Sequence, residues 1–372
     1  MSLIFAGDKG VKPTTLIIMA RPQIKLTCAV AGLLSGVLLT SSLAADDTAL
    51  PMLKVTGNHL TTVSGDAVHL HGVDIPSLEW GQGDHLTNSL ETALDWGANI
   101  IRLPLCQDRW FGHTPDSTNG AAGYQKIVED FVKSAAARKC YVILDLHWSD
   151  GNVWGQYIGQ HNMPDDNSIV FWKDVSARFA NNPAVLFDLY NEPHDISWDV
   201  WRNGGNVLDT KSRVDPNGIF AYHSPGMQKL LDTCRSTGAK NVVVAGGVDW
   251  AYDLQGIAGG YALVDKKGYG VVYDTHIYSV KPWYTHGNTR SQDWDRIIMS
   301  TGKKYPVMVG EFGSGTNNYA GAVLAFARQN DLPWIAWCLH PHARPCLIMN
   351  WKYAPTTYGE VVKNALQEEA VK

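Results

Sequence analysis

The sequence predicts an α/β fold, a single-domain (β/α)8 barrel of the TIM-barrel type with a β-hairpin at its N-terminal end. Eight short apolar segments of strand length alternate with longer segments of helical length. The 372 residues are sufficient for one such barrel, and no repeat, low-complexity tract or linker indicates an appended domain. The alternative is an open doubly wound sheet. It is disfavoured because the first strand is not followed by a Gly-x-Gly-x-x-Gly turn and there is no Walker loop.

Residues 1–44 are expected to be a secretory signal peptide, which leaves residues 45–372 as the barrel domain. Arg21 and Lys25 precede an apolar stretch over residues 26–39, and small residues follow up to Ala44. The apolar stretch is too short for a membrane span, so no membrane attachment is expected after its removal. The first 18 residues are an unusually long prelude, and Met19 would be a more typical start.

The hairpin and the barrel elements follow from the pattern of apolar residues. Two strand-like pieces, residues 53–57 and 60–65, are separated by Asn58 and His59 and should cap the bottom of the barrel. The barrel strands are expected at residues 68–73, 100–103, 141–146, 185–189, 242–245, 271–274, 307–310 and 334–337. The helices are expected at residues 87–96, 124–138, 169–180, 225–236, 293–300, 319–329 and 358–370.

The composition restricts the partners of the protein. The chain is 45% hydrophobic and 18% charged with a formal net charge of −5, and it has no basic runs, which disfavours nucleic acid as a partner. Fourteen Trp and fifteen Tyr are more than a core needs, and they suggest a surface that stacks on flat molecules. We expect a monomer.

The cysteines outside the signal peptide are odd in number, so at least one thiol is free or bonded between molecules. They are Cys106, Cys140, Cys234, Cys338 and Cys346. Cys338 and Cys346 flank a short Pro-containing loop and are the expected disulfide pair. No Cys-x-x-Cys or His-Cys cluster has the spacing of a metal site, so we expect neither metal nor cofactor.

The segment VLFDLYNEP, residues 185–193, suggests a catalytic site. Its apolar part reads as a strand buried on both faces, and Pro193 stops the strand. Asn191 and Glu192 then lie where the strand leaves the core. Barrel enzymes keep their catalytic groups at the carboxyl ends of such strands, although a single Glu there is more often a structural charge.

Polar or aromatic residues occupy the ends of five further strands, and a coordinated set of this kind is not explained by structural charges alone. In chain order the set comprises Arg102, His147, Asn191, Glu192, His276, Tyr278, Glu311 and Trp337. Over the whole mature chain the sequence resembles glycoside hydrolase family 5, in its cellulase-like branch. The family carries the same residue types at the same strand ends, and FWKDVSARFANNPAVLFDLYNEPH and NVVVAGGVDWAYDL are also similar to it.

The chemistry of glycosidic bond cleavage fits two of these residues. Cleavage uses two carboxyl groups, one that donates a proton and one that attacks or activates water. Glu192 and Glu311 would face each other across the barrel mouth, and the residues alone allow either assignment of roles. The resemblance implies that Glu192 is the acid/base and Glu311 the nucleophile of a retaining mechanism.

The other members of the set are expected to support this pair. Arg102 and Tyr278 should contact Glu311, and His276 is expected beside Glu192. Asn191 and His147 should bind sugar hydroxyls, with Trp337 as the stacking floor. For Arg102 a structural ion pair, and for His147 a satisfied strand-end position, remain the alternatives.

Other residues near these motifs are expected to have structural or sugar-binding roles. Asp145 and Asp188 read as buried polar groups that orient their neighbours rather than as catalysts. Trp148, Trp250 and Trp283 are the tryptophans most strongly expected to line a sugar-binding groove, because each closely follows a strand end. The other loop tryptophans are Trp80, Trp154 and Trp198, and the histidines expected on loops or at the surface are His85, His161, His194 and His223.

These observations predict a secreted, periplasmic or extracellular endo-β-1,4-glucanase that cleaves internal bonds of cellulose-type polysaccharides. The alternatives with the same mechanism are a β-mannanase, a xyloglucanase or lichenase, and a β-1,3-glucanase. A glycan-binding barrel without catalysis is disfavoured because both carboxylates and their supporting set are present. A barrel isomerase or aldolase would need a Lys or a metal set at the strand ends, and the strand-end list has neither.

Overall fold

The computed structural model describes residues 50–210, 218–279, 291–315 and 317–371. The expected signal peptide, residues 1–44, and the alternative start at Met19 lie outside these residues. Within the described ranges, no helix combines the length and the apolar character that a membrane crossing requires.

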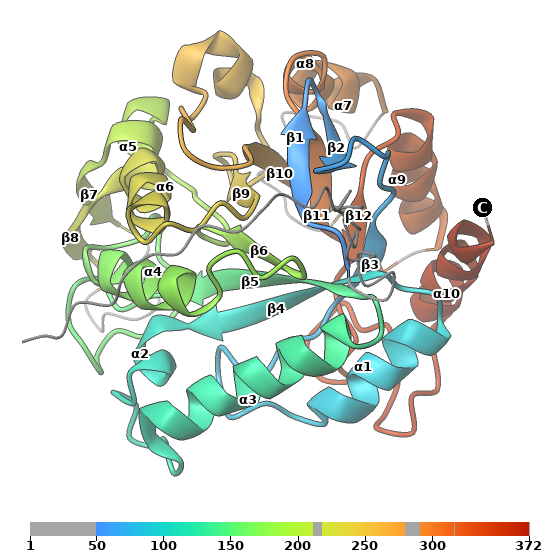
Figure 1. Cartoon of the computed structure of the whole chain (residues 1–372), viewed down its shortest axis with the longest axis horizontal. Coiled ribbons are helices and arrows are strands. Elements are labelled where there is room, and N and C mark those ends of the chain that lie inside the picture. The colour runs from blue at the N-terminus through green and yellow to red at the C-terminus, as the bar shows by residue number, and fades with distance from the viewer. Residues whose placement is uncertain (1–49, 211–217, 280–290, 316, 372) are drawn as a thin grey trace, which may run out of the picture. The chain divides into compact units, whose positions relative to one another are not determined.

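Eight parallel strands close into a barrel, which confirms the predicted fold class (Figure 1). Around the ring they are β3 (His71–Asp74), β4 (Ile100–Cys106), β5 (Tyr141–Trp148), β6 (Val185–Asp188), β9 (Val243–Gly246), β10 (Val271–Tyr278), β11 (Val307–Gly313) and β12 (Trp334–Ala336). The pairing of β12 with β3 closes the ring. Because all eight strands are parallel, their carboxyl ends meet at one end of the barrel.

Helices surround the barrel and cover the outer face of its strands (Figure 1). They are α1 (Leu86–Asp95), α2 (Gln107–Trp110), α3 (Gly120–Ala136), α4 (Asn167–Arg178), α5 (Trp198–Asn203), α6 (Gly226–Ser236), α7 (Ser291–Ile297), α8 (Met299–Gly302), α9 (Asn317–Gln329) and α10 (Thr357–Ala370). Helix α3 shows why these segments pack there. It buries Tyr124, Val128, Phe131 and Ala135, which share one face at helical spacing.

The alternation of side chains along each strand sets which residues face the inside of the barrel. In β4, Ile100 belongs to the inner core and Ile101 to the layer between strands and helices. Arg102 has the same parity as Ile100 and therefore faces inward. In β5 the same parity aligns Ile143 of the inner core with Asp145 and His147. The strands thus place apolar residues in the lower barrel and polar residues toward the carboxyl end.

The predicted N-terminal hairpin is present as β1 (Leu53–Thr56) paired antiparallel with β2 (His59–Thr62). Leu53 and Leu60 are buried in the same apolar cluster as Ile100 and Ile335 of the barrel strands. Their burial against the amino ends of the strands agrees with the expectation that the hairpin caps the bottom of the barrel.

The structure differs from the sequence prediction between β6 and β10. An antiparallel hairpin, β7 (Gly205–Asp209) with β8 (Phe220–Ser224), lies between β6 and β9 and was not predicted. Its strands are short and half exposed, with Leu208 facing solvent, so they lack the continuous apolar run that marked the barrel strands. Between β9 and β10 the chain forms only one π-helical segment, η1 (Ile257–Tyr261).

The expected disulfide between Cys338 and Cys346 is wrong, because the five cysteines of the described chain are all free. The Sγ atoms of Cys338 and Cys346 instead lie 3.1 and 3.5 Å from the carbonyl oxygen of Ala343. Burial raises the pKa of the Cys140 and Cys234 thiols to about 12, so these side chains act as apolar core groups.

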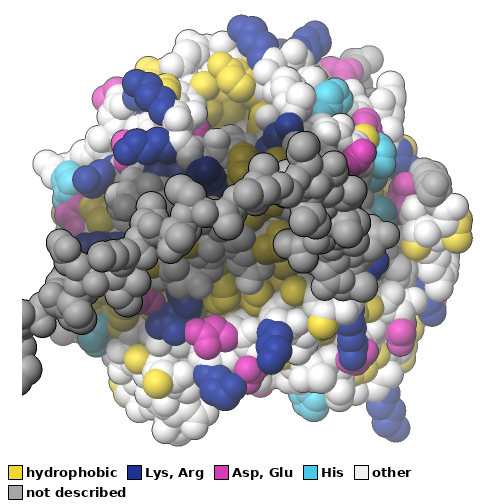
Figure 2. Space-filling view, in the orientation of Figure 1, with side chains coloured by type: hydrophobic (Ala, Val, Ile, Leu, Met, Phe, Trp, Pro, Cys, Tyr) yellow, Lys and Arg dark blue, Asp and Glu magenta, His cyan; other side chains and the backbone are white. Residues whose placement is uncertain are grey.

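Charged side chains of both signs are interspersed on the face shown in Figure 2. This distribution agrees with the absence of basic runs in the sequence. A dense basic surface of the kind that binds nucleic acid is not visible among the coloured residues of this face.

Candidate active site

Two glutamates meet at the carboxyl end of the barrel. Glu192 follows β6 and Glu311 lies within β11. Together with His276 of β10, they bring one side-chain nitrogen or oxygen each to within 4.8 Å of one another. An oxygen of Glu192 is therefore at most 4.8 Å from an oxygen of Glu311. Both carboxylates are largely buried and retain a small exposed fraction of 8% and 4%.

Strong hydrogen bonds fix both oxygens of Glu311. Arg102 Nη1 donates to Oε1 at 2.6 Å, and the Tyr278 hydroxyl donates to Oε2 at 2.6 Å. Burial, together with the negative charges of Glu311 and Glu192, raises the pKa of Tyr278 well above its usual range, so the phenol remains a neutral donor. Glu311 is thus held in one orientation beside a permanent positive charge.

Arg102 is completely buried and is surrounded by carboxyl groups. Its Nε donates to Asp188 Oδ2 at 3.0 Å, its Nη1 to Asp74 Oδ1 at 3.2 Å, and its Nη2 lies 3.1 Å from Asp145 Oδ2. Burial raises the pKa of Asp145 to about 8 and that of Asp74 and Asp188 well above the usual range, although Arg102 opposes the shift. Asp145 and Asp188 therefore orient Arg102, in keeping with the interpretation from sequence.

His276 bridges the two glutamates. Its Nδ1 is 3.1 Å from Glu192 Oε1 and 3.6 Å from Glu311 Oε2, and its Nε2 is 3.1 Å from Asp274 Oδ2. Burial opposes the charged ring, but the charges of Glu311 and Asp274 outweigh burial and raise the pKa of His276 to about 10. The ring is therefore an imidazolium at neutral pH and donates from both nitrogens.

Asp74 and Asp274 are functional neighbours that the sequence analysis missed. Asp74 ends β3 and contacts Arg102. Asp274 contacts His276 and also accepts a backbone hydrogen bond from Gly310. A Cβ atom at position 310 would overlap the Asp274 carboxylate, so glycine is required directly before Glu311. Asp274 could have been found from its position two residues before His276, which places both side chains on one face of the strand.

Asn191 and His147 form the polar wall beside Glu192. Asn191 Oδ1 accepts from Arg102 Nη2 at 2.8 Å, and its Nδ2 is 3.3 Å from His147 Nε2. Burial and the charge of Arg102 lower the pKa of His147 to about 3. The ring is therefore neutral, and its 2.6 Å contact with Asp145 is a hydrogen bond from Nδ1–H rather than an ion pair.

Aromatic rings continue this wall outward. Trp337 is half-buried and stacks on His147 with ring centroids 5.6 Å apart and an interplanar angle of 15°. Trp148, which ends β5, is half-buried and contacts Trp80 at 6.3 Å. The backbone carbonyl of Trp80 accepts a hydrogen bond from Arg109. Trp337 is thus tied to the site through His147, and Trp148 and Trp80 form a second pair of partly exposed indoles, at the end of β5 and after β3.

The remaining tryptophans are placed differently. Trp250 is half-buried and stacks on His194 at 3.6 Å. It belongs to three consecutive non-glycine residues with φ near +60°, Asp249 to Ala251, a costly arrangement that typically occurs at functional sites. Trp283 lies outside the described residues. Trp154 contacts Phe111 and His113, and Trp198 contacts Trp201 and Tyr261, so neither is shown beside the carboxylate pair.

Two histidines expected on loops or at the surface are in fact buried. His161 is fully buried, and its Nε2 contacts the carbonyl oxygen of Tyr157. His194 is buried beside Trp250, and its Nδ1 is 2.8 Å from the carbonyl oxygen of Glu192. Loop position alone gave no signal of this burial. His85 and His223 are exposed, as expected.

Glu192, His276 and Glu311 are also the one group in the described chain whose ligand atoms are close enough to hold a metal ion. The same three side chains are hydrogen-bonded to one another and to their neighbours, since His276 contacts both Glu192 and Asp274, and Glu311 accepts from Arg102 and Tyr278. This network is the arrangement of an acid–base centre.

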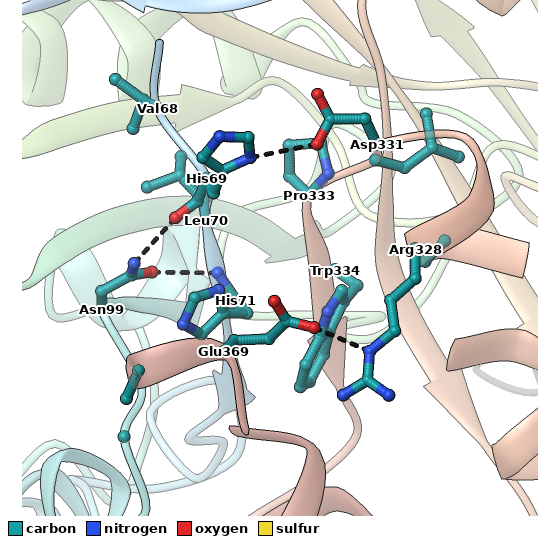
Figure 3. Close-up of a pocket in the computed structure, with 14 residues that line it drawn as sticks. Val68, His69, Leu70, His71, Asn99, Arg328, Asp331, Pro333, Trp334 and Glu369 are labelled. Atoms are coloured by element: carbon teal, nitrogen blue, oxygen red, sulfur yellow. Dashed lines mark hydrogen bonds and ion pairs between the residues drawn. The ribbon is translucent and has the colours of Figure 1, made fainter. Parts of the chain in front are cut away.

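A separate cavity of about 600 Å³ lies at the opposite end of the barrel (Figure 3). It adjoins the amino ends of β3 and β12, where His71 and Trp334 line it. Its charged groups are already paired, since His69 contacts Asp331 and Arg328 donates to Glu369. Because barrel enzymes react at the carboxyl ends of the strands, this cavity is not the candidate active site.

A closed parallel barrel with a close carboxylate pair at the carboxyl ends of its strands defines the class of protein, a (β/α)8 glycoside hydrolase. A family model described as cellulase (glycosyl hydrolase family 5) matches residues 61–343. The chain therefore belongs to glycosyl hydrolase family 5.

Similar proteins agree with this membership. The chain is 26% identical over 297 residues to the endoglucanase MaCel5A of Microbulbifer sp.. The matched region covers 77% of this chain and 50% of that protein. It is 26% identical over 339 residues to an endoglucanase of Paenibacillus polymyxa, and that matched region covers 77% of this chain and 79% of that protein. The chain thus spans about half the length of the Microbulbifer relative.

Solved structures share the fold. The β-glucanase SdGluc5_26A of Saccharophagus degradans superposes with a TM-score of 0.66 and 21% identity, over 86% of this chain and 94% of that chain. The catalytic domain of the Thermobifida fusca endoglucanase Cel5A gives a TM-score of 0.62 and 18% identity, over 85% of this chain and 97% of that chain. Both likenesses show the barrel architecture.

Proposed function

We propose that this protein is a retaining endo-β-1,4-glucanase that is exported and acts on cellulose-type β-glucans. The observation that carries the proposal is the close approach of Glu192 and Glu311, whose nearest side-chain oxygens are within 4.8 Å. Retaining glycosidases hold their carboxyl groups about 5–5.5 Å apart, whereas inverting enzymes need about 6.5–9.5 Å to admit a water molecule. The observed approach is compatible with the retaining geometry, and membership of glycosyl hydrolase family 5 favours the retaining mechanism.

The different surroundings of the two carboxylates support their assignment. Glu311 accepts short hydrogen bonds from Arg102 and Tyr278, and this environment suits a nucleophile that must be ionised and fixed. In the first step, a Glu311 oxygen attacks the anomeric carbon and forms a glycosyl-enzyme while Glu192 protonates the departing glycosidic oxygen. In the second step, Glu192 takes a proton from water, and that water displaces Glu311.

The substrate class follows from the walls of the site. Trp337 would form the floor for the sugar at the cleavage point, and Asn191 and His147 would bind its hydroxyls. Trp148 and Trp80 are half-buried neighbours, and we propose that further units of an unbranched glucan stack on them. The endoglucanase relatives support β-1,4-glucan as the polymer.

The assignment of the nucleophile is tested by trapping. A 2-deoxy-2-fluoro cellobioside with an activated leaving group should form a stable adduct, and mass spectrometry of the digested protein should locate it on Glu311. Glu192→Ala should lose most activity on substrates with poor leaving groups and recover part of it with azide. An adduct on another residue, or equal loss on all leaving groups, would contradict the two assignments.

Glu79→Gln serves as the matched control for these variants. Glu79 is buried near the site, and burial raises the pKa of its carboxyl group to about 8, so glutamine mimics its neutral form. Its activity should stay close to that of the wild type. A substrate panel of carboxymethylcellulose, mannan, xyloglucan, lichenan and laminarin then tests specificity. We expect the highest rate on carboxymethylcellulose, with a rapid fall in viscosity that indicates internal cleavage.

A further inference from the structure

Gln160 connects the loop after β5 to the residues beside the carboxylate pair. The loop covers residues 149–166, between β5 and α4. Gln160 Nε2 donates to the carbonyl oxygen of Glu192 at 3.1 Å and to that of His161 at 2.9 Å. Gln160 Oε1 accepts from Asn191 Nδ2 at 2.9 Å. A single side chain therefore contacts both the backbone of Glu192 and the side chain of Asn191.

The contact with Asn191 determines how that amide is turned. Asn191 Oδ1 accepts from Arg102 at 2.8 Å, so its Nδ2 must point to the other side. One hydrogen of Nδ2 is directed to Gln160 Oε1 at 2.9 Å, and the other points toward His147 Nε2 at 3.3 Å. The longer bond is the weaker one. A sugar hydroxyl can therefore take the hydrogen that faces His147 while the bond to Gln160 persists.

Hydrogen bonds hold the loop on both sides of Gln160, so the backbone position of this residue is fixed. On one side, Ser149 and Gly159 exchange two backbone hydrogen bonds of 3.0 Å. On the other side, the Tyr190 hydroxyl accepts from the His161 amide and donates to its carbonyl oxygen, both at 3.0 Å. Tyr190 directly precedes Asn191. The loop and the segment that carries the acid/base residue are thus joined at neighbouring residues.

We propose that Gln160 is a positioning residue that orients Asn191 Nδ2 toward the 2-hydroxyl of the sugar and fixes the backbone that carries Glu192. The inference rests on the proposed function of Asn191 and Glu192. Hydrogen bonds to the 2-hydroxyl strengthen in the transition state of glycoside cleavage, so the orientation of Asn191 acts on kcat more than on KM.

Two substitutions separate the two contacts. Gln160→Met removes all three hydrogen bonds with little change in size. Gln160→Glu keeps an oxygen for Asn191 but places a second oxygen against the carbonyls of Glu192 and His161. Gln156→Met is the control, because Gln156 lies on the same loop and is exposed.

The readout is kcat/KM on aryl β-cellobiosides with good and poor leaving groups, and on a matched 2-deoxy substrate. Gln160→Met should lose about 10- to 100-fold on the 2-hydroxy substrate, mainly in kcat, and several-fold less on the 2-deoxy substrate. Gln160→Glu should retain the preference for the 2-hydroxyl and lose activity mainly on poor leaving groups. Gln156→Met should match the wild type on substrates with good and poor leaving groups and on the 2-deoxy substrate.

Glu192→Ala, measured in parallel, separates failure of this inference from failure of the proposed function. If Glu192→Ala loses activity on poor leaving groups while both Gln160 variants behave like Gln156→Met, the role of Gln160 is refuted and the proposed function stands. An equal loss of Gln160→Met on 2-hydroxy and 2-deoxy substrates, with Gln160→Glu unaffected, would also refute it. If Glu192→Ala remains fully active, both proposals fail.

Discussion

Replacing Asp274 by Asn should weaken the protein at neutral pH and leave it little changed in alkali. Asp274 Oδ2 is 3.1 Å from His276 Nε2. Asn would keep an oxygen for the Gly310 amide but place an amide N–H against the ring nitrogen. The charged ring would then lose its anionic partner at Nε2, which lowers the pKa of His276, whereas Glu311 and Glu192 would still favour the charged form.

The magnitude follows from the pKa of His276, which its charged neighbours raise from 6.5 to about 10 against the effect of burial. Because one pKa unit corresponds to about 1.4 kcal/mol, protonation of His276 stabilises the fold by on the order of 5 kcal/mol below pH 6.5. This stabilisation is lost as pH rises toward 10, since the folded pKa lies above the unfolded value. The bond to Asp274, as a charged hydrogen bond, contributes about 1.5–3 kcal/mol of it.

Urea denaturation of both proteins from about pH 6 to about pH 10 measures the effect. The free energy of unfolding of Asp274→Asn should be lower by about 1.5–3 kcal/mol at the acid end, and the difference should shrink as His276 deprotonates in the wild type. Asp265→Asn is the matched control. Asp265 pairs with Arg235, which does not titrate in this range, so its difference should be constant. A constant difference for Asp274→Asn as well would refute the charged state of His276.

Two further substitutions test the contacts around Glu311. Tyr278→Phe removes the 2.6 Å bond to Glu311 and should lower kcat/KM about 10- to 100-fold. The control Tyr358→Phe loses a buried bond to the backbone carbonyl of Phe312 and should lower stability alone. Similar kinetics for the two variants would count against a role of Tyr278 in catalysis. Gly310→Ala should cost about 1–3 kcal/mol of stability and reduce kcat, because the added Cβ overlaps the Asp274 carboxylate. The control Gly321→Ala in α9, where the space is open, should be neutral or stabilising in thermal unfolding. Equal stability of the two variants would contradict the steric argument.

The barrel could be predicted from the sequence because its strands are buried on both faces and therefore appear as apolar runs. Arg102, His147 and Glu311 lie within three of these strands and Glu192 follows a fourth, so the polar residues in and after the runs also predicted which side chains would meet. The β7–β8 hairpin was missed because its strands are half exposed and carry no such run. Gln160 was missed for a related reason, since it lies on a loop and acts through hydrogen bonds that no periodic pattern encodes.

Asp-x-His is a local signal that sequence analysis can use in barrels of this kind. In β5, Asp145 contacts His147, and in β10, Asp274 contacts His276. Residues two apart on a strand share a face, so the carboxyl group can bond one ring nitrogen of the histidine and leave the other for the site. The two pairs nevertheless set opposite protonation states, with the pKa of His147 lowered to about 3 and that of His276 raised to about 10. Burial lowers the pKa of both rings. The cation Arg102 adds to this effect at His147, whereas the anions Glu311 and Asp274 outweigh it at His276.

The side chains inside the barrel change from apolar to polar along the strands. Ile100, Ile143 and Leu186 fill its lower part, and Arg102, Asp145 and Asp188 follow two residues later on the same face. Burying Arg102 and so many carboxyl groups is costly, and apolar residues at these positions would commonly be neutral or stabilising. The apolar lower half and the hairpin residues that close it therefore supply stability, which lets the upper half keep Arg102 and its polar partners in the arrangement that the proposed reaction needs. On this argument, an apolar replacement of Asp188 together with Arg102 would retain the fold and lose the activity, because Glu311 would no longer have its cation.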